Sequence, residues 1–288
     1  LSILLVAVLA LPMSRLVHWY GQYIQYPSFR EAMTNYTSGG YALLGVFAAC
    51  LLTAAVLRLV RISGSLPQML DCMAIGGGVG IGVGRLAFAF NSSVRGMILP
   101  ESVGFPFASP ITNPVSGAQE NRFATFMLQS ALVTVIVAGL LAFMLVQKIR
   151  KKKIADGEVF WIFLLAYGAS QALCDSTRYD KMFFRSNGFV GMVQIMGLLG
   201  MLVPIVLFSV RMVKSRKLKP WQFALWTGIL GLLGLAGYME YFVQRNGHRA
   251  ALAYSVMGAC LLGVVILGLV IRALIRETAP KGGKYLRQ

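Results

Sequence analysis

The chain has 288 residues, of which 57% are hydrophobic and only 13% are charged. Soluble domains carry about 25% charged residues, so this composition excludes an ordinary soluble domain and predicts a protein that crosses a membrane several times. The 27 Lys and Arg residues exceed the 10 Asp and Glu residues, which gives a formal net charge of +17. In a soluble protein this charge would suggest a nucleic-acid partner. Here we expect membrane topology to explain it, and we expect no nucleic acid to bind.

All four cysteines lie in apolar segments. They show neither CxxC spacing nor a nearby histidine, and they are Cys50, Cys72, Cys174 and Cys260. Metal sites and disulfide frameworks are recognised in a sequence by such spacings. We therefore expect no metal, no other cofactor and no disulfide framework.

Eight segments are apolar over the roughly 20 residues that a helix needs to cross a bilayer, or nearly so. In chain order they are Leu1–Tyr20, Tyr41–Val60, Leu66–Phe90, Phe126–Val146, Val159–Asp175, Phe189–Val210, Phe223–Phe242 and Leu252–Ile271. Because the chain begins inside the first apolar run, we expect the first helix to be truncated. The predicted fold class is all-α, a polytopic transmembrane bundle of about eight helices.

Basic residues follow the second, fourth, sixth and eighth of these segments. The four basic runs are Arg58 and Arg61, Lys148–Lys153, Arg211–Lys219 and Arg272–Arg287. By the positive-inside rule these connections are cytoplasmic, so the C-terminus is predicted to be cytoplasmic as well. Lys148–Lys153 could also contact anionic lipid headgroups.

An arginine stands inside the third apolar segment, in the stretch Gly76–Gly96, GGGVGIGVGRLAFAFNSSVRG. A charge within a span costs at least about 2.5 kcal/mol unless it is paired or hydrated, so Arg85 predicts an anion site at membrane depth. Gly76, Gly80 and Gly84 recur every four residues, and we expect a neighbouring helix to approach this face closely. We do not interpret the glycines as a dinucleotide-binding motif, because no strand–turn–helix unit surrounds them.

Four polar features gather on the predicted outer face. They are Ser14–His18, Tyr36–Gly40, Arg85–Gly96 and Asp175–Arg185. The loop Met97–Gln119, rich in Pro, Ser and Gly, lies on the same side, and we expect it to form an ordered cap or a lid. Polar residues on one face, with cations at membrane depth, predict a pocket for an anionic lipid headgroup.

These stretches resemble, in their order along the chain, the prolipoprotein diacylglyceryl transferase family. LPQMLDCMAIGGGVGIGVGRLAFAFNSSVRG, residues 66–96, resembles the signature region of that family. Further similarities lie in PMSRLVHWY (12–20), SGGYALLG (38–45), GEVFWIFLLAYGASQALCDSTRYD (157–180) and GMVQIMGLLGMLVPI (191–205). We therefore predict a transferase-like membrane domain at residues 1–212, followed at 213–288 by two added helices and a basic cytoplasmic tail.

The resemblance implies a multi-pass enzyme of the bacterial cytoplasmic membrane whose site faces the outside. Such enzymes transfer the diacylglyceryl group of phosphatidylglycerol to the lipobox cysteine thiol of a prolipoprotein signal peptide, and they release glycerol phosphate. Membrane-depth arginines suit this reaction, because they bind phosphate through charge-assisted hydrogen bonds and stabilise it as it leaves. The implied catalytic residues are Arg85, Arg178 and Asp175, to which we add His18 from its position, and the substrate-binding residues are Arg15, Ser38, Gly39, Gly40, Asn91, Gly96 and Gln194.

The chain departs from the family pattern at several polar positions. Ser38 stands where the family has histidine, Phe88 where it has asparagine, and Gln171 where it has arginine. His18, three residues after Arg15, is a candidate replacement for the missing histidine, although it also fits an interfacial aromatic belt. These departures leave two other hypotheses open: a non-catalytic relative that binds anionic lipid or a membrane partner, and a transporter. Transporters often contain internal repeats, and we find no convincing repeat in this sequence, so we rank the transporter last.

Each candidate also has a structural interpretation. Arg85 could pair with Asp175, which would then orient an arginine and not act as a base. Arg15 could extend its guanidinium to the membrane interface. Arg178 lies at a helix end, where a cation suits the helix dipole, and Asn91 could be a helix C-cap.

Overall fold

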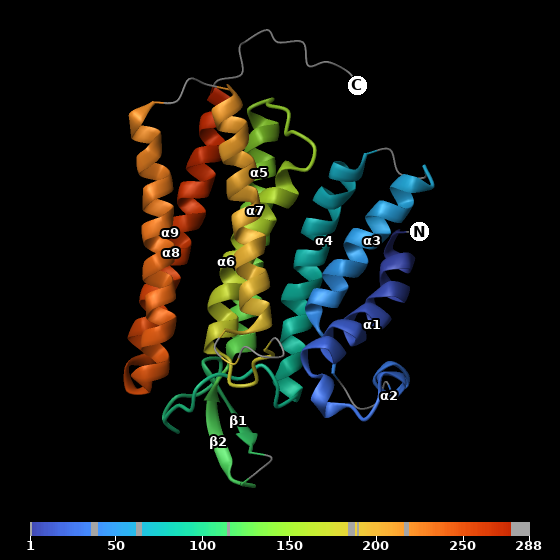
Figure 1. Cartoon of the computed structure of the whole chain (residues 1–288), viewed down its shortest axis with the longest axis vertical. Coiled ribbons are helices and arrows are strands. Elements are labelled where there is room, and N and C mark those ends of the chain that lie inside the picture. Colours follow the sequence, from blue (N-terminus) through green and yellow to red (C-terminus); the bar gives the residue numbers. More distant parts are fainter. Residues whose placement is uncertain are drawn as a thin grey trace. The chain divides into compact units, whose positions relative to one another are not determined.

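The computed structural model describes residues 2–35, 40–61, 65–113, 116–183, 188, 190–215 and 219–277 (Figure 1). Within these residues, seven helices are long and apolar enough to cross a membrane. They are α1 (Ser2–Gly21), α4 (Leu66–Leu86, continued by the 3₁₀ turn η3, Ala87–Phe90), α5 (Thr125–Ile149), α6 (Glu158–Thr177), α7 (Met192–Ser215), α8 (Pro220–Arg245) and α9 (Ala250–Glu277). The prediction of an all-α, polytopic helix bundle is confirmed.

The remaining apolar helix, α3 (Leu43–Leu59), has 17 residues. At about 1.5 Å per residue it is roughly 25 Å long, which is the lower limit for a membrane span. With α3 included, every apolar segment predicted from the sequence corresponds to one helix of the structure. The shorter elements are η1 (Tyr23–Gln25), α2 (Phe29–Thr34), β1 (Ala108–Thr112), β2 (Gln119–Phe123) and η4 (Gly247–Arg249).

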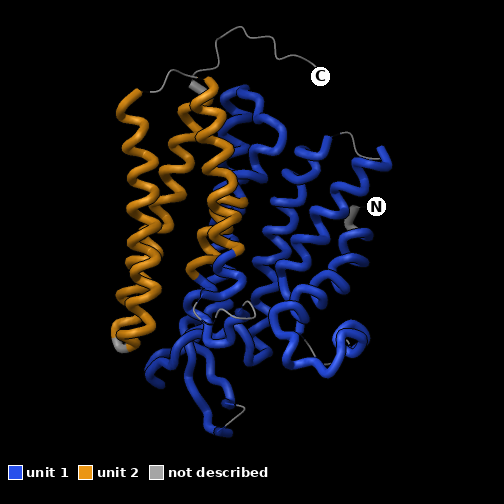
Figure 2. Tube along the Cα trace, in the orientation of Figure 1, with its two compact units in different colours: residues 1–163, 174–195 blue, residues 164–173, 196–288 orange. Residues whose placement is uncertain are grey.

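The chain divides into two compact units (Figure 2). Unit 1 comprises Leu1–Phe163 and Cys174–Ile195, and unit 2 comprises Leu164–Leu173 and Met196–Gln288. This division follows packing, and it differs from the boundary after residue 212 that the family resemblance suggested. That boundary stays a prediction.

In unit 1, α1 packs against α3 and α4 packs against α5. The close approach of α4 to α5 occurs at Gly78 and Gly82: a Cβ at Gly78 would lie 2.6 Å from Val137 Cγ2, and Ser130 Oγ donates a hydrogen bond to the Gly82 carbonyl at 2.7 Å. The expectation that Gly76, Gly80 and Gly84 form the packed face was wrong. A Cβ at any of these three positions would meet nothing within 4 Å among the described residues.

The connection from α4 to α5 contains an antiparallel hairpin of β1 and β2, with Ala108 opposite Phe123 and Thr112 opposite Gln119. Figure 1 shows this hairpin beyond the adjoining ends of α4 and α5. On the other edge of β2, Ile98 forms a bridge with Arg122. The loop predicted to be an ordered cap is thus built on strand pairing, and Pro114 within it lies outside the described residues.

In unit 2, α8 packs against α9. A Cβ at Gly263 of α9 would lie 2.9 Å from Leu232 of α8, so the two helices approach closely there. Trp226 Nε1 of α8 donates a hydrogen bond to Ser209 Oγ of α7 at 3.0 Å. The two added helices therefore form a pair, and a hydrogen bond joins this pair to α7.

Candidate functional site

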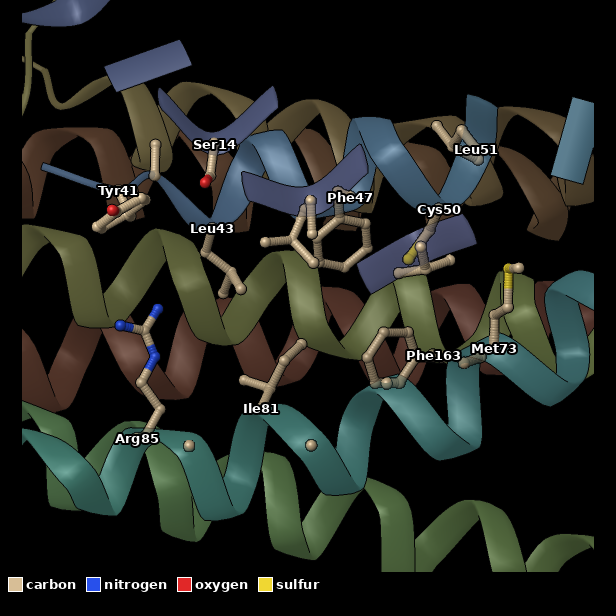
Figure 3. A pocket seen from close by; sticks show the side chains of 18 of the residues that line it. Ser14, Tyr41, Leu43, Phe47, Cys50, Leu51, Met73, Ile81, Arg85 and Phe163 are labelled. Atoms are coloured by element: carbon tan, nitrogen blue, oxygen red, sulfur yellow. The ribbon is translucent and has the colours of Figure 1, made fainter. Parts of the chain in front are cut away.

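An apolar cavity of about 550 Å³ lies in unit 1 between α1 and α3 on one side and α4 on the other, with two aromatic side chains of α6 completing it (Figure 3). Small-molecule sites have volumes of about 300–1,000 Å³. Side chains with nitrogen or oxygen atoms gather at one end, where Figure 3 shows Ser14, Tyr41 and Arg85, while Leu51 and Met73 lie at the opposite end. The cavity therefore combines a polar end with a long apolar chamber.

Arg85 supplies the positive charge of this cavity. It lies in the last turn of α4, is only 9% exposed, and extends from the helix into the cavity (Figure 3). Its guanidinium carbon lies 5.5 Å from the centre of the Phe88 ring, a cation–π contact. The neighbouring Gly84, which has no side chain, also lines the cavity. A guanidinium in such surroundings favours an anionic ligand such as a phosphate.

Arg15, predicted to bind substrate, donates to backbone carbonyls. Its Nε donates to Ala32 at 2.8 Å and its Nη1 to Gly40 at 3.2 Å, and its Nη2 donates to Asn35. The side chain is 1% exposed. Arg15 thus fixes the chain between α1 and α3. Of the residues that the structure describes, those lining the cavity do not include it.

His18 and Gly40 belong to the same framework. His18 Nδ1 lies 2.8 Å from Tyr26 Oη, in a hydrogen bond that either group could donate. Gly40 has a φ of +82°, and a Cβ there would lie 2.9 Å from Arg15 Nη1 and closer still to Tyr26 Oη. Glycine is therefore required at this position both by its conformation and by close contact. The predicted site residues Ser38 and Gly39 lie outside the described residues.

Asp175, at the end of α6, lies against the start of α7. It is fully buried, and its Oδ2 accepts a hydrogen bond from the backbone nitrogen of Gln194 at 3.2 Å. A carboxylate at a helix N-terminus is stabilised by the orphan N–H groups and the helix dipole. Asp175 Oδ1 lies 3.5 Å from Arg178 Nη1. The structure thus brings Asp175, Arg178 and Gln194 together, and the ion pair of Asp175 is made with Arg178.

Arg178 is held between two acids. Its Nε donates to Asp180 Oδ1 at 2.9 Å. Burial opposes the charge of Arg178, but the hydrogen bond that Arg178 donates to Asp180 and the charges of the Asp180 and Asp175 carboxylates outweigh it and raise the pKa of Arg178. Burial likewise opposes the charge of Asp180, but the hydrogen bond and charge of Arg178 outweigh it and lower the pKa of Asp180. Asp180 Oδ2 also accepts from the Val94 backbone nitrogen at 3.0 Å, so this cluster ties the end of α6 to the exit of α4.

The exit of α4 is organised by Arg95, to which sequence analysis gave no role of its own. Arg95 is 1% exposed, and its Nη2 donates to the carbonyl oxygens of Phe88 at 3.0 Å and Asn91 at 2.8 Å. Its guanidinium carbon lies 4.4 Å from the centre of the Phe126 ring. Burial lowers the pKa of Arg95, while Tyr179 and Asp180 oppose that effect. The sequence does contain one indication of this role: Arg95 follows soon after the end of a predicted helix, where a cation can bind the last carbonyl oxygens of that helix.

The two other predicted residues of this exit shape the backbone. Asn91 Oδ1 accepts from the Ser93 nitrogen at 3.0 Å, which closes a turn. Gly96 donates its backbone N–H to the Phe123 carbonyl at 2.8 Å. A Cβ at Gly96 would lie 2.9 Å from the Thr177 carbonyl oxygen, so only glycine allows this close approach.

The described residues contain no group of three or more His, Cys, Asp or Glu side chains placed to hold a metal ion. Gln171, which the sequence resemblance places where the family has arginine, is 3% exposed. It lies in unit 2, and neither atom of its side-chain amide has a hydrogen-bond partner there or elsewhere in the described chain.

A family model described as prolipoprotein diacylglyceryl transferase matches residues 1–210 of the chain. The matched stretch contains the whole lining of the cavity, from Val6 to Phe163, and the Asp175–Asp180 cluster. It ends within α7, before α8 and α9 begin. A comparison with curated proteins finds no match.

Proposed function

Because the chain belongs to the prolipoprotein diacylglyceryl transferase family, membrane transferases of lipoprotein biosynthesis, we propose that it transfers the diacylglyceryl group of phosphatidylglycerol to a lipobox cysteine. The observation that carries this proposal is the burial of Arg85 at one end of an apolar cavity. A phospholipid has matching chemistry, with a phosphate to bind the guanidinium and acyl chains to fill an apolar chamber. Phosphatidylglycerol is such a lipid, and its phosphate is anionic.

In this reaction the thiol sulfur of the prolipoprotein forms a bond to the glyceryl carbon that carries the phosphate. The carbon–oxygen bond breaks, and its electron pair leaves on the phosphate oxygen of glycerol phosphate, which takes up the thiol proton. Arg85 would bind that phosphate and stabilise the charge that develops on it. Among the described residues, those lining the cavity include no Asp, Glu or His, so the proposal assigns the thiol proton to the leaving phosphate.

Arg178 and Asp175 would then act by positioning. Arg178 and Asp175 contact each other. Arg178 also donates a hydrogen bond to Asp180, and Asp175 accepts one from the backbone nitrogen of Gln194, so both side chains already have protein partners. This assignment differs from the sequence-based one, in which Arg178 and Asp175 are catalytic and Arg15 binds substrate. Arg15, bound to three backbone carbonyls, would support the site from its framework.

We place the site at the outer face of the cytoplasmic membrane. The basic runs after α3 and α5 mark the cytoplasmic side, and Arg85 lies in the turn of α4 farthest from the first of these runs. The prolipoprotein signal peptide would approach from the same outer side. A site at this depth gives the buried arginine access to the headgroups of the outer leaflet.

A transfer assay tests the proposal. Purified protein is mixed with phosphatidylglycerol and a lipobox peptide, and the lipidated peptide and released glycerol phosphate are measured. We expect product from the wild type and a loss of about 10²–10³-fold in kcat for Arg85→Ala, the effect of removing one group that stabilises transition-state charge. Arg30→Ala, at an exposed arginine of α2, is the control and should retain activity. Full activity of Arg85→Ala would refute the site.

A second candidate is a non-catalytic membrane protein that binds anionic lipid. The buried amide of Gln171, which replaces a family arginine, favours it. This candidate predicts phosphatidylglycerol bound to the purified protein and no lipidated peptide, in a mixture where an active family member gives product. Any turnover that depends on Arg85 would exclude it.

A further inference from the structure

The cavity is long in one direction. Its lining on α4 runs from Leu70 to Arg85, which at about 1.5 Å per residue is roughly 22 Å along the helix. The hydrocarbon core of a bilayer is about 30 Å thick, so one leaflet contributes about 15 Å. A chamber that starts at Arg85 near the outer face therefore reaches past the membrane centre. Its length suits an extended hydrocarbon chain better than a compact ligand.

The α4 wall of this chamber is bare backbone at three positions. Gly77, Gly80 and Gly84 line the cavity, and a Cβ at any of them would meet nothing within 4 Å in the described chain. Gly76 has the same open surroundings, but the cavity lining does not include it. On the opposite wall, α3 presents bulky side chains such as Phe47 (Figure 3). The width of the chamber beside α4 thus depends on these glycines.

We propose that this cavity holds one acyl chain of the donor lipid along α4, and that Gly77 and Gly80 determine which chain lengths fit. The inference rests on the proposed function, because it places the lipid phosphate at Arg85. Gly80 lies about 7.5 Å from Arg85 along the helix, and Gly77 about 12 Å. A side chain at Gly80 would stop the acyl chain near the headgroup, and one at Gly77 would stop it farther down.

A substitution at the other end of the chamber should shift the preferred acyl-chain length in the opposite direction, toward longer chains. Met73 lies there, away from Arg85 (Figure 3). Met73→Ala removes part of a flexible side chain and deepens the chamber. If the chamber measures the acyl chain, Gly77→Val should favour shorter chains and Met73→Ala longer ones. A general loss of packing would not produce opposite shifts.

The test compares Gly77→Val and Gly80→Val with Gly76→Val, a matched control on the same helix with the same change in helix propensity. The purified proteins receive a mixture of phosphatidylglycerols with saturated chains from short to long, and mass spectrometry of the lipidated peptide gives the ratio of kcat/KM for each length. Gly76→Val should keep the wild-type profile. Gly77→Val should lower the ratio of long to short chains about tenfold, the effect of losing space for about two buried methylenes. Gly80→Val should exclude all but the shortest chains.

A Gly77→Val profile equal to that of Gly76→Val would overturn the proposal. If Gly77→Val does not fold, Gly77→Ala and Met73→Ala decide by the same measurement, and unchanged profiles for both would overturn it equally. Should the wild type give no product, the proposed reaction fails. The acyl-chain profile of phosphatidylglycerol bound to each purified protein, read by native mass spectrometry, then tests the cavity alone, with the same shifts expected and unchanged profiles again overturning it.

Discussion

Replacing Arg95 with methionine tests whether this arginine holds the exit of α4. Arg95 is 1% exposed and donates to the carbonyl oxygens of Phe88 at 3.0 Å and Asn91 at 2.8 Å. A hydrogen bond from a charged donor contributes about 1.5–3 kcal/mol, and a buried carbonyl left without a donor costs about 1–3 kcal/mol. Because these contributions overlap, we expect Arg95→Met to lower the free energy of unfolding by about 3–5 kcal/mol.

Thermal unfolding of the purified protein in one detergent measures this loss. A change of 1 kcal/mol shifts the melting temperature of a chain of this size by roughly 2–4 °C, so Arg95→Met should melt at least about 6 °C below the wild type. Arg30→Met removes an exposed arginine of α2 and should melt within about 1 °C of the wild type. If Arg95→Met melts together with the wild type, the carbonyl contacts do not stabilise the exit and the reasoning is refuted.

Two more predictions concern the framework of the site. Gly40→Ala should lower the free energy of unfolding by about 2–4 kcal/mol, because φ at Gly40 is +82° and the methyl group would contact Tyr26. Gly104→Ala is the control, because a Cβ at Gly104 would meet nothing within 4 Å among the described residues. Equal melting temperatures of the two variants would contradict this prediction. Since Arg178 lowers the pKa of Asp180, the ion pair should stabilise the protein fully above the ordinary aspartate pKa of about 3.9 and lose its effect as the pH falls through the lowered value. Melting temperatures across this range should fall less steeply for Asp180→Asn, and parallel curves would argue against the ion pair.

One departure from the family pattern changes the surroundings of Arg85. The sequence resemblance places Phe88 where the family has asparagine, and the centre of the Phe88 ring lies 5.5 Å from the guanidinium carbon of Arg85. A ring face stabilises a cation but cannot bind a phosphate as an amide can. The chain therefore presents to the cavity a cation in more apolar surroundings than the family pattern implies. Such surroundings strengthen the attraction of Arg85 for an anion.

Local hydrophobicity determined the helices of this protein. A run of about 20 apolar residues satisfies its backbone hydrogen bonds within itself, so the sequence indicates a membrane helix without knowledge of its neighbours. For this reason each predicted apolar segment matches one helix, although α7 and α9 extend several residues past their predicted ends. The basic runs between segments are equally local, and they predict orientation independently of packing.

Only the tertiary structure decided which glycines of α4 face a helix and which face the cavity. Gly78 and Gly82 are four residues apart, as are Gly76 and Gly80, so spacing by itself cannot distinguish the two faces. The neighbouring helix makes the difference: α5 places Val137 and Ser130 against Gly78 and Gly82, whereas the face with Gly76 and Gly80 has open surroundings among the described residues. A residue pattern gives the period of a helix, but it does not give its rotation about its axis relative to its neighbours.

The sequence also identified which polar residues needed an explanation, since a charge at membrane depth is costly wherever it occurs. It could not say what each charge binds. Arg15 donates to the carbonyls of Ala32 and Gly40, which the fold brings beside it from 17 and 25 residues away in the chain, while Arg85 extends into a cavity (Figure 3). The sequence by itself therefore determined the family, the membrane helices and the set of candidate residues. The tertiary structure decided which candidates line the cavity and which form its framework, because donors and acceptors distant in the chain meet only when the helices pack.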